Sequence, residues 1–435
     1  MKIINAKNIY IHLIIWALVI ILTSAFTSWK SESERNRILK VDGLGYYSYL
    51  PAFFIYQDLN FHYYDSIYQS DLSKGKQPYD FRERSEYGTI NKYYIGSAIC
   101  QIPFFIPVYT YFKISGKVFN GYENAFQVAS HIAAICFFLL GLYYVFKTLE
   151  TFQLSKTWAI LSCYAILLGT NAGYMVVSEP GLSHLYSFAW ISIFLYATRK
   201  LVLSNFQKKW IWISGLALGF ILLIRPINLI ILFALPFIWG NIKLYQSKKL
   251  IQSYIQIGIL SIMLFSIQFI YYYLATGNAI IYSYNEEGFD FMHAHFFEFL
   301  WSYRKGFFLY TPLFLLLFPS LILGIKERKY KSILSFIFFF VILTFVFSSW
   351  WLWHYGGGLG TRVFIEFYPL FIIPIVWYFS KLKQEFVKSL SILFLLVSVY
   401  FGQLTHWQYR QGKIHWDSAT KEQYYDNLFR IDNLL

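Results

Sequence analysis

The sequence predicts an all-α, polytopic membrane protein with about 11 transmembrane helices. Apolar residues make up 57% of its 435 residues and aromatic residues 22%, whereas only 14% are charged. Soluble domains average roughly 25% charged residues. Apolar runs of about 20 residues, the length that a helix needs to cross a bilayer, recur from Tyr10 to Leu404. These features argue against a soluble globular enzyme, and the aromatic content excludes a disordered chain.

The loops between the apolar runs alternate in charge. With the N-terminus in the cytoplasm, the loops on that side carry 18 basic and three acidic residues, whereas the other side carries 19 basic and 20 acidic residues. This positive-inside pattern predicts an N-in, C-out topology and accounts for the net charge of +14 without a nucleic-acid partner. We expect a single integral membrane domain over residues 1–435 with spans at 10–28, 125–146, 157–177, 183–198, 210–224, 227–242, 250–274, 307–324, 332–349, 363–380 and 389–405. The first span lacks a clean cleavage site and is interpreted as uncleaved.

The first external loop, residues 29–124, is predicted to hold two interfacial helices. They correspond to Tyr46–Phe61 and Tyr93–Phe112, both rich in aromatic residues. If the second stretch crossed the membrane, every later basic loop would change sides. This stretch also contains Pro103 and Pro107, which are expected to break a regular helix. The external C-terminal tail, residues 406–435, is expected to pack on the external part of the protein.

Ionisable residues gather at the outer ends of the predicted spans, and the span centres are nearly free of charge. A pump or an ion-coupled transporter usually needs ionisable groups at mid-membrane. The deepest polar residues, His131 and Gln268, are interpreted as packing residues. The three cysteines lie in apolar stretches, so neither a disulfide framework nor a metal-binding cysteine pair is predicted.

An acidic residue and two glycines follow the first span, in the run Asp42-Gly43-Leu-Gly45-Tyr-Tyr. One interpretation is an ordinary Asp-Gly turn at a helix end. The other is a carboxylate at the membrane surface that takes a proton from an acceptor hydroxyl.

The order of one span, an acid and two interfacial helices resembles the C-type (GT-C) membrane glycosyltransferases. The resemblance covers residues 1 to about 240 and extends to Asn91-Lys92-Tyr93-Tyr94 and to Arg225-Pro226. Within that superfamily the chain is most similar to the aminoarabinose transferase and protein O-mannosyltransferase group, as a Bacteroidetes-type member. Asp42 matches the family's first acid, whereas Gly43 stands where a second acid is usual. The resemblance implies a GT-C-like fold, a polyprenyl-phosphate sugar donor, and a lysine at position 92 that contacts the donor phosphate.

A lipid phosphate that leaves at the outer leaflet needs cations to stabilise its growing charge. Lys92, Arg225 and Arg362 are the candidates, with Arg304 less favoured. The alternative role for such residues is interfacial anchoring by long basic side chains. Arg225 lies in a turn between two apolar spans, where a charge without a function would be costly.

Two further external segments supply candidate substrate-binding residues. Glu179 and His184 frame one turn, as a helix start with an acidic first turn or as a site for the sugar or the acceptor. In the loop from Trp350 to Arg362, tryptophans and glycines suit either an interfacial belt or a carbohydrate and polyprenyl platform. The candidates in and next to this loop are Trp353, His354, Arg362 and Glu366, and the last two are expected to form an ion pair if the segment is α-helical.

No metal site is predicted, and a divalent metal is possible without support from the sequence. The run His293-Ala-His295, with acids nearby, has weak spacing for a metal and is interpreted as part of a solvated loop.

The sequence therefore predicts an inner-membrane glycosyltransferase of the cell envelope that works at the periplasmic face. It would move a sugar from a polyprenyl phosphate to a hydroxyl of a lipid, glycan or protein acceptor, with Asp42 as general base and inversion at the sugar carbon. Alternatives are an O-antigen-type polymerase or ligase, a lipid-linked sugar flippase or transporter, and a scaffold. A flippase would need charged residues along a central path, and a scaffold gives no reason for Arg225.

Overall fold

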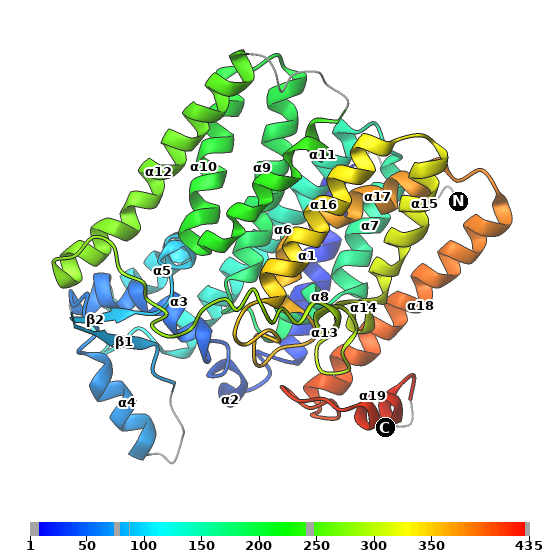
Figure 1. Cartoon of the computed structure of the whole chain (residues 1–435). Helices are drawn as coiled ribbons and strands as arrows, with labels where there is room; N and C mark the ends of the chain where they lie inside the picture. Colours follow the sequence, from blue (N-terminus) through cyan, green and yellow to red (C-terminus); the bar gives the residue numbers. More distant parts are fainter. Residues whose placement is uncertain (1–7, 74–78, 87, 241–247, 431–435) are drawn as a thin grey trace.

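The computed structural model describes residues 8–73, 79–86, 88–240 and 248–430. Within these ranges the elements are helices joined by turns and loops, together with one two-stranded antiparallel hairpin, β1 (Arg82–Ser85) and β2 (Gly88–Asn91). Long helices stand side by side, and short helices and loops gather at one end of them (Figure 1). The predicted all-α, polytopic membrane fold is therefore observed, with the hairpin as an element that the sequence did not suggest.

Each of the eleven predicted spans is a helix or a run of consecutive helical segments. By length and composition, six helices within the described ranges could cross a membrane, or seven if the bent pair of α7 and α8 forms one span. The eleven segments are α1 (Ile9–Phe26), α6 (Asn124–Thr151), α7 (Lys156–Gly169) with α8 (Asn171–Ser178), α9 (His184–Leu203), α10 (Lys208–Ile224), η2 (Pro226–Ala234) with α11 (Leu235–Trp239), α12 (Lys248–Thr276), α14 (Phe307–Tyr310) with η4 (Pro312–Leu316) and α15 (Leu317–Lys326), α16 (Tyr330–Ser348), η5 (Arg362–Phe367) with α17 (Tyr368–Lys381), and α18 (Glu385–Arg410).

The breaks between these segments have local causes. Arg225 is extended, with φ of −153°, because the residue before a proline is biased away from the helical region. Pro226 then begins the 3-10 helix η2, so α10 ends at Ile224. Thr170 separates α7 from α8, which are bent by 61°, and its side chain accepts a hydrogen bond from the first turn of α8. These breaks place Arg225 and Thr170 between helical segments.

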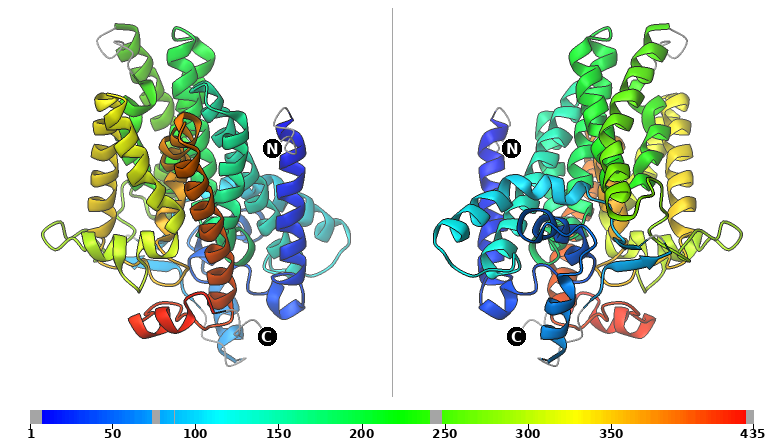
Figure 2. Two further views of the ribbon diagram at one scale, coloured as in Figure 1. Left: turned by 90° about the vertical axis from the view of Figure 1, so that its right-hand side faces the viewer. Right: turned by 90° about the vertical axis from the view of Figure 1, so that its left-hand side faces the viewer.

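The first external loop contains α2 (Glu32–Arg35), α3 (Asp42–Pro51), the π-helical turn η1 (Ala52–Tyr56), α4 (Tyr64–Ser73), the hairpin and α5 (Gly96–Ile114). The first predicted interfacial helix corresponds to α3 with η1. The second corresponds to α5, which is seen nearly end-on in Figure 1 and lies crosswise to the long helices in Figure 2.

The expectation that two prolines break the second interfacial helix is wrong. Pro103 and Pro107 both lie inside one continuous helix, α5. Their spacing of four residues puts them on one side of the helix, so the missing N–H groups affect that side only. Packing of α5 against α3 and α6 stabilises the remaining turns.

Burial separates inner from outer helices. In the span that contains η5 and α17, 89% of the most apolar window is buried, against 22% in α12 and 28% in α1 and α18. Of the two deep polar residues, His131 has partners for both ring nitrogens, whereas Gln268 has one for its carbonyl oxygen and none in the described ranges for its buried Nε2. His131 bonds to Trp29 and to the carbonyl of Val176, and Gln268 accepts the backbone N–H of Ile95 at 2.9 Å.

Candidate active site

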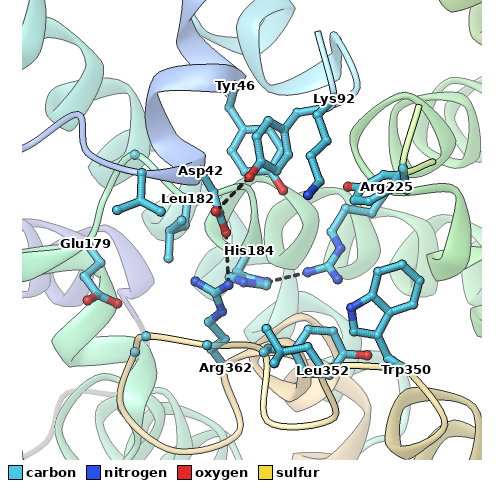
Figure 3. Close-up of a pocket in the computed structure, with 18 of the residues that line it drawn as sticks. Asp42, Tyr46, Lys92, Glu179, Leu182, His184, Arg225, Trp350, Leu352 and Arg362 are labelled. Atoms are coloured by element: carbon cyan, nitrogen blue, oxygen red, sulfur yellow. Dashed lines mark hydrogen bonds and ion pairs between the residues drawn. The ribbon is translucent and has the colours of Figure 1, made fainter. Parts of the chain in front are cut away.

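A cavity of about 780 Å³ lies where the external loop meets the helix bundle. Its walls come from the start of α3, from the residues before α5, from the α8–α9 turn, from the break between α10 and η2, from residues 282–289 and from the loop that precedes η5 (Figure 3). Six of the nine predicted site residues line it: Asp42, Lys92, Glu179, His184, Arg225 and Arg362. Among these six, Asp42 and Arg362 are 320 positions apart in the sequence and meet at the cavity.

Asp42 is held from both sides at the first turn of α3. Its Oδ1 accepts a hydrogen bond from the Tyr93 hydroxyl at 2.8 Å, and its Oδ2 accepts one from Arg362 Nη2 at 3.0 Å. Burial by itself raises the pKa of Asp42, but the positive charge of Arg362 and the Tyr93 hydrogen bond lower it below the ordinary value. Asp42 is therefore an ionised carboxylate with a fixed orientation.

Close packing explains why glycines occupy positions 43 and 45, next to Asp42. A Cβ on Gly43 would lie 3.2 Å from the Cα of Gly181, in the turn that carries Glu179 and His184. A Cβ on Gly45 would lie 2.2 Å from the ring of Tyr93. The Asp-Gly-Leu-Gly run therefore lets α3 approach both neighbouring segments closely, and a second acid at position 43 would push the α8–α9 turn away.

Beneath the cavity, Glu366 is fully buried and receives hydrogen bonds from several groups. Arg225 Nη1 donates to its Oε1 at 2.8 Å, His184 Nδ1 lies 2.6 Å from the same oxygen, and Asn228 donates to Oε2. A buried guanidinium is tolerated because its charge is compensated in this way. Glu366 does not line the cavity but fixes Arg225 and His184, which do.

The expected ion pair between Arg362 and Glu366 is not formed, because Arg362 pairs with Asp42 and Glu366 with Arg225. The segment is the 3-10 helix η5, with three residues per turn. In that geometry residues four apart point about 120° away from each other, whereas in an α-helix they share a face.

Lys92 and Glu179 lie at different parts of the cavity wall. Lys92 Nζ forms an ion pair with Glu287 at 2.5 Å and lies over the ring of Tyr284. Glu179 Oε1 lies 3.7 Å from Lys40 Nζ, whereas Glu179 Oε2 is buried without a hydrogen-bond partner in the described part of the chain. Arg362 Nε is likewise buried without a hydrogen-bond partner in the described part of the chain. Buried groups of this kind are costly unless another molecule satisfies them.

Two predicted residues of the Trp350–Arg362 loop do not reach the cavity. Trp353 stacks on His295, with ring centroids 5.5 Å apart. His354 is buried, with Nδ1 3.1 Å from a carboxylate oxygen of Asp417, and burial together with the charge of Arg304 lowers the pKa of His354 to about 4. Besides Arg362, the members of this loop that line the cavity are Trp350, Trp351, Leu352, Tyr355 and the three glycines 356–358.

Sequence reasoning missed several residues of the cavity. Tyr93 lies within a run that carried the family resemblance, but nothing in the sequence indicated that its hydroxyl reaches Asp42. The C-terminal tail was expected only to pack on the external part, yet its Trp416 lines the cavity. Further aromatic residues of the wall without an assigned role include Tyr46, Tyr79, Tyr284 and Tyr409.

Comparison with solved structures shows a likeness in fold. Neither family models nor curated proteins match the sequence. Among solved structures, an oligosaccharyltransferase from Archaeoglobus fulgidus, solved in complex with Zn and sulfate, matches with a TM-score of 0.57 at 14% identity. The match covers 95% of this chain and 54% of the other, so this chain spans about half the length of that protein. At this identity the likeness shows a shared fold.

The carboxylates of the site are paired with cations. No group of three or more His, Cys, Asp or Glu residues in the described ranges is arranged to hold a metal ion, and His293 pairs instead with Asp290. The carboxylates that line or support the cavity each face a cation: Asp42 with Arg362, Glu179 with Lys40, Glu287 with Lys92, and Glu366 with Arg225. A metal would have to displace these cations, so no step is assigned to one.

Proposed function

We propose that this protein is a membrane glycosyltransferase that transfers a sugar from a polyprenyl-phosphate donor to an acceptor hydroxyl. One observation carries the proposal: the ionised carboxylate of Asp42 shares a cavity with the cations Lys92, Arg225 and Arg362. An anionic base beside several cations suits a reaction in which a hydroxyl loses a proton while a phosphate gains negative charge. The fold shared with an oligosaccharyltransferase supports this assignment.

In the proposed step the acceptor oxygen attacks the anomeric carbon, and its proton passes to Asp42. The bond between that carbon and the phosphate oxygen breaks, and its electron pair stays on the polyprenyl phosphate. Attack from the side opposite the leaving group inverts the anomeric carbon. Because Arg362 and Tyr93 keep the pKa of Asp42 low, the proton moves late, when the acceptor oxygen has already given electron density to the sugar.

The three cations are proposed to hold the phosphate. Arg225 is rigid because Glu366 and the α10–η2 break fix it, and Arg362 offers a buried Nε without a partner in the described ranges. Lys92 would exchange its pair with Glu287 for the donor phosphate. A prearranged set of donors stabilises the leaving group without reorganisation during the reaction.

The lipid part of the donor is proposed to leave the cavity along its apolar wall. That wall includes Ile224, Ile227, Phe289, Trp351 and Leu352, close to Arg225. A polyprenyl chain gains free energy there by removing apolar surface from water.

We propose an inner-membrane location with the cavity at the periplasmic face. In Figure 1 the basic N-terminus of α12 lies at the end of the bundle opposite α3, α4 and the hairpin. The positive-inside pattern then assigns the end with the cavity to the outside.

The test is turnover by the full chain in lipid nanodiscs with polyprenyl-phosphate hexoses and a panel of acceptors, measured as released polyprenyl phosphate. Asp42→Asn is expected to reduce the rate at least about 100-fold, because it removes the base. Asp58→Asn is the matched control: Asp58 lies in the same external loop, its side chain is 22% exposed against 21% for Asp42, and it does not line the cavity. Wild-type turnover by a folded Asp42→Asn variant would contradict the mechanism.

A further inference from the structure

An exposed tryptophan of the C-terminal tail forms part of the cavity wall. Trp416 is 61% exposed and lines the cavity at the same part of the wall as the glycine-rich loop. A Cβ on Gly357 would lie 3.2 Å from the Trp416 ring, so the glycine lets the indole lie against the loop backbone. A large apolar ring exposed beside a polar cavity needs an explanation, since water contact with it is unfavourable.

The indole is exposed although its backbone is firmly held. The carbonyl of Trp416 accepts hydrogen bonds from Lys305 Nζ at 2.6 Å and from the Tyr409 hydroxyl at 2.9 Å. Lys305 is only 3% exposed and also donates to the carbonyl of Gly358. Next along the tail, Asp417 forms an ion pair with Arg304 at 2.9 Å. The tail therefore presents Trp416 to the cavity in a fixed position, at low entropic cost to a ligand.

Membrane anchoring does not explain this exposure. The tail that precedes α19 (Lys421–Asn427) lies past the ends of the long helices, at the end of the molecule that also carries α2 and α4 (Figures 1 and 2). Its surroundings are polar, because Asp417, the next residue of the tail, pairs with Arg304 and His354.

Near Trp416 and the glycine-rich loop the cavity wall carries the acidic Glu179, whereas the proposed phosphate-binding part carries the basic Arg225. Figure 3 places Glu179 and Arg225 on opposite sides of Asp42. Glu179 is 8% exposed, and its Oε2 has no hydrogen-bond partner within the described ranges. A carboxylate repels a phosphate but accepts hydrogen bonds from hydroxyl groups. The donor phosphate therefore belongs with Arg225, and the acceptor belongs between Glu179 and Asp42.

The backbone at this rim offers little to a peptide. Peptides that bind as strands need free backbone N–H and C=O groups. Here the N–H of Gly358 donates to the Tyr409 hydroxyl, the carbonyl of Gly358 accepts from Lys305, and the carbonyl of Trp416 already has two donors. What remains for a ligand is a flat aromatic face and side-chain acceptors. A sugar ring matches this pair, with C–H groups on its face and hydroxyls around its edge.

We propose that the acceptor is a saccharide whose ring stacks on Trp416 while its hydroxyls bond to Glu179, so that the attacking hydroxyl faces Asp42. This inference rests on the proposed glycosyl transfer and adds the class of the acceptor. Trp416 is then an acceptor-binding residue supplied by the C-terminal tail, and the tail determines specificity.

The experiment offers the nanodisc-reconstituted full chain two kinds of acceptor with the same alkyl chain: octyl hexosides and an octylated serine peptide. Octyl hexosides are expected to be glycosylated. Trp416→Ala is expected to lower kcat/KM for them about tenfold, with Trp416→Phe close to wild type and the KM of the donor unchanged in both. Trp212→Ala is the matched control, because Trp212 is 64% exposed on α10 and does not line the cavity.

Hydrolysis of the donor without an acceptor separates the two proposals. If the wild-type protein consumes no polyprenyl-phosphate sugar under any condition, the proposed function fails. If it consumes the donor but Trp416→Ala keeps the full kcat/KM for octyl hexosides, the saccharide assignment is overturned. Transfer to the serine peptide with none to the hexosides overturns it as well.

Discussion

At the scale of single residues, the chemistry depends on how Asp42 is held. Arg362 and Tyr93 come from different segments and bind different oxygens of its carboxylate, at 3.0 and 2.8 Å. Together they outweigh burial, which by itself would favour the protonated acid. The site therefore keeps Asp42 ionised at a position where an isolated carboxyl would tend to take up a proton.

This balance predicts a pH effect. Because the pKa of Asp42 is lowered in the wild type, kcat/KM is expected to fall only at a pH below the ordinary aspartate value. In Arg362→Gln the charge that lowers the pKa is gone and burial remains, so the acid limb is expected to move to higher pH. Tyr93→Phe is expected to move it in the same direction by less. The measurement is kcat/KM against pH for donor consumption; an acid limb that stays in place or moves to lower pH would refute the assigned role of Asp42.

Individual site residues could be predicted from the sequence where their position at the end of a span was enough to place them near the cavity. Polar residues at the outer ends of spans are placed at one membrane face, so Asp42, Glu179 and Arg225 were found without knowledge of their partners. Their pairing depends on tertiary structure: the pair of Asp42 with Arg362 joins residues 320 positions apart. The predicted pair of Arg362 with Glu366 is wrong because the local helix is 3-10 rather than α.

At the scale of secondary-structure elements, close contacts between backbones shape the site. Helix α3 begins against the α8–α9 turn at Gly43 and against the residues before α5 at Gly45. The ends of α10 and of η5 are irregular, and these irregular turns carry Arg225 and Arg362. Glycine and proline therefore determine where the cations and the carboxylate meet.

Gly45→Ala tests this packing. Its Cβ would lie 2.2 Å from the Tyr93 ring, so the ring and its hydrogen bond to Asp42 must move. We expect the free energy of unfolding to fall by about 1–3 kcal/mol, as for other overpacked sites, and turnover to fall with it. Gly258→Ala in α12 is the control, since its Cβ would meet nothing within 4 Å. Thermal unfolding and turnover of both variants check the expectation, and equal behaviour of the two would show that the contact at Gly45 is unimportant.

The elements themselves were largely predictable. All eleven apolar segments became helical because a chain in lipid must satisfy its backbone hydrogen bonds internally. The hairpin of residues 82–91 could not be predicted from the sequence, nor could the continuous helix α5 with its two prolines. Both depend on packing against neighbouring segments.

At the scale of the whole molecule, the proposed periplasmic reaction requires the cavity and the basic loops to lie on opposite sides of the membrane. Gln207, between α9 and α10, and Ser418, in the C-terminal tail, are both exposed. With a membrane-impermeant maleimide, Ser418→Cys is expected to react in spheroplasts and Gln207→Cys only in inverted inner-membrane vesicles. The wild-type chain, in which Cys100 and Cys163 are buried and Cys136 lies in the α6 span, gives the background. The reverse labelling pattern would place the cavity in the cytoplasm and exclude a periplasmic reaction.

The most direct test of the central claim is to locate a bound lipid phosphate. A structure of the full chain in nanodiscs with farnesyl phosphate is predicted to show the phosphate within about 3 Å of Arg225 and Arg362 nitrogens, with the isoprenoid along Ile227 and Trp351. Lys92 is predicted to turn from Glu287 toward the phosphate. A phosphate found beside Lys40, or a cavity that binds no phosphate at saturating farnesyl phosphate, would contradict the account.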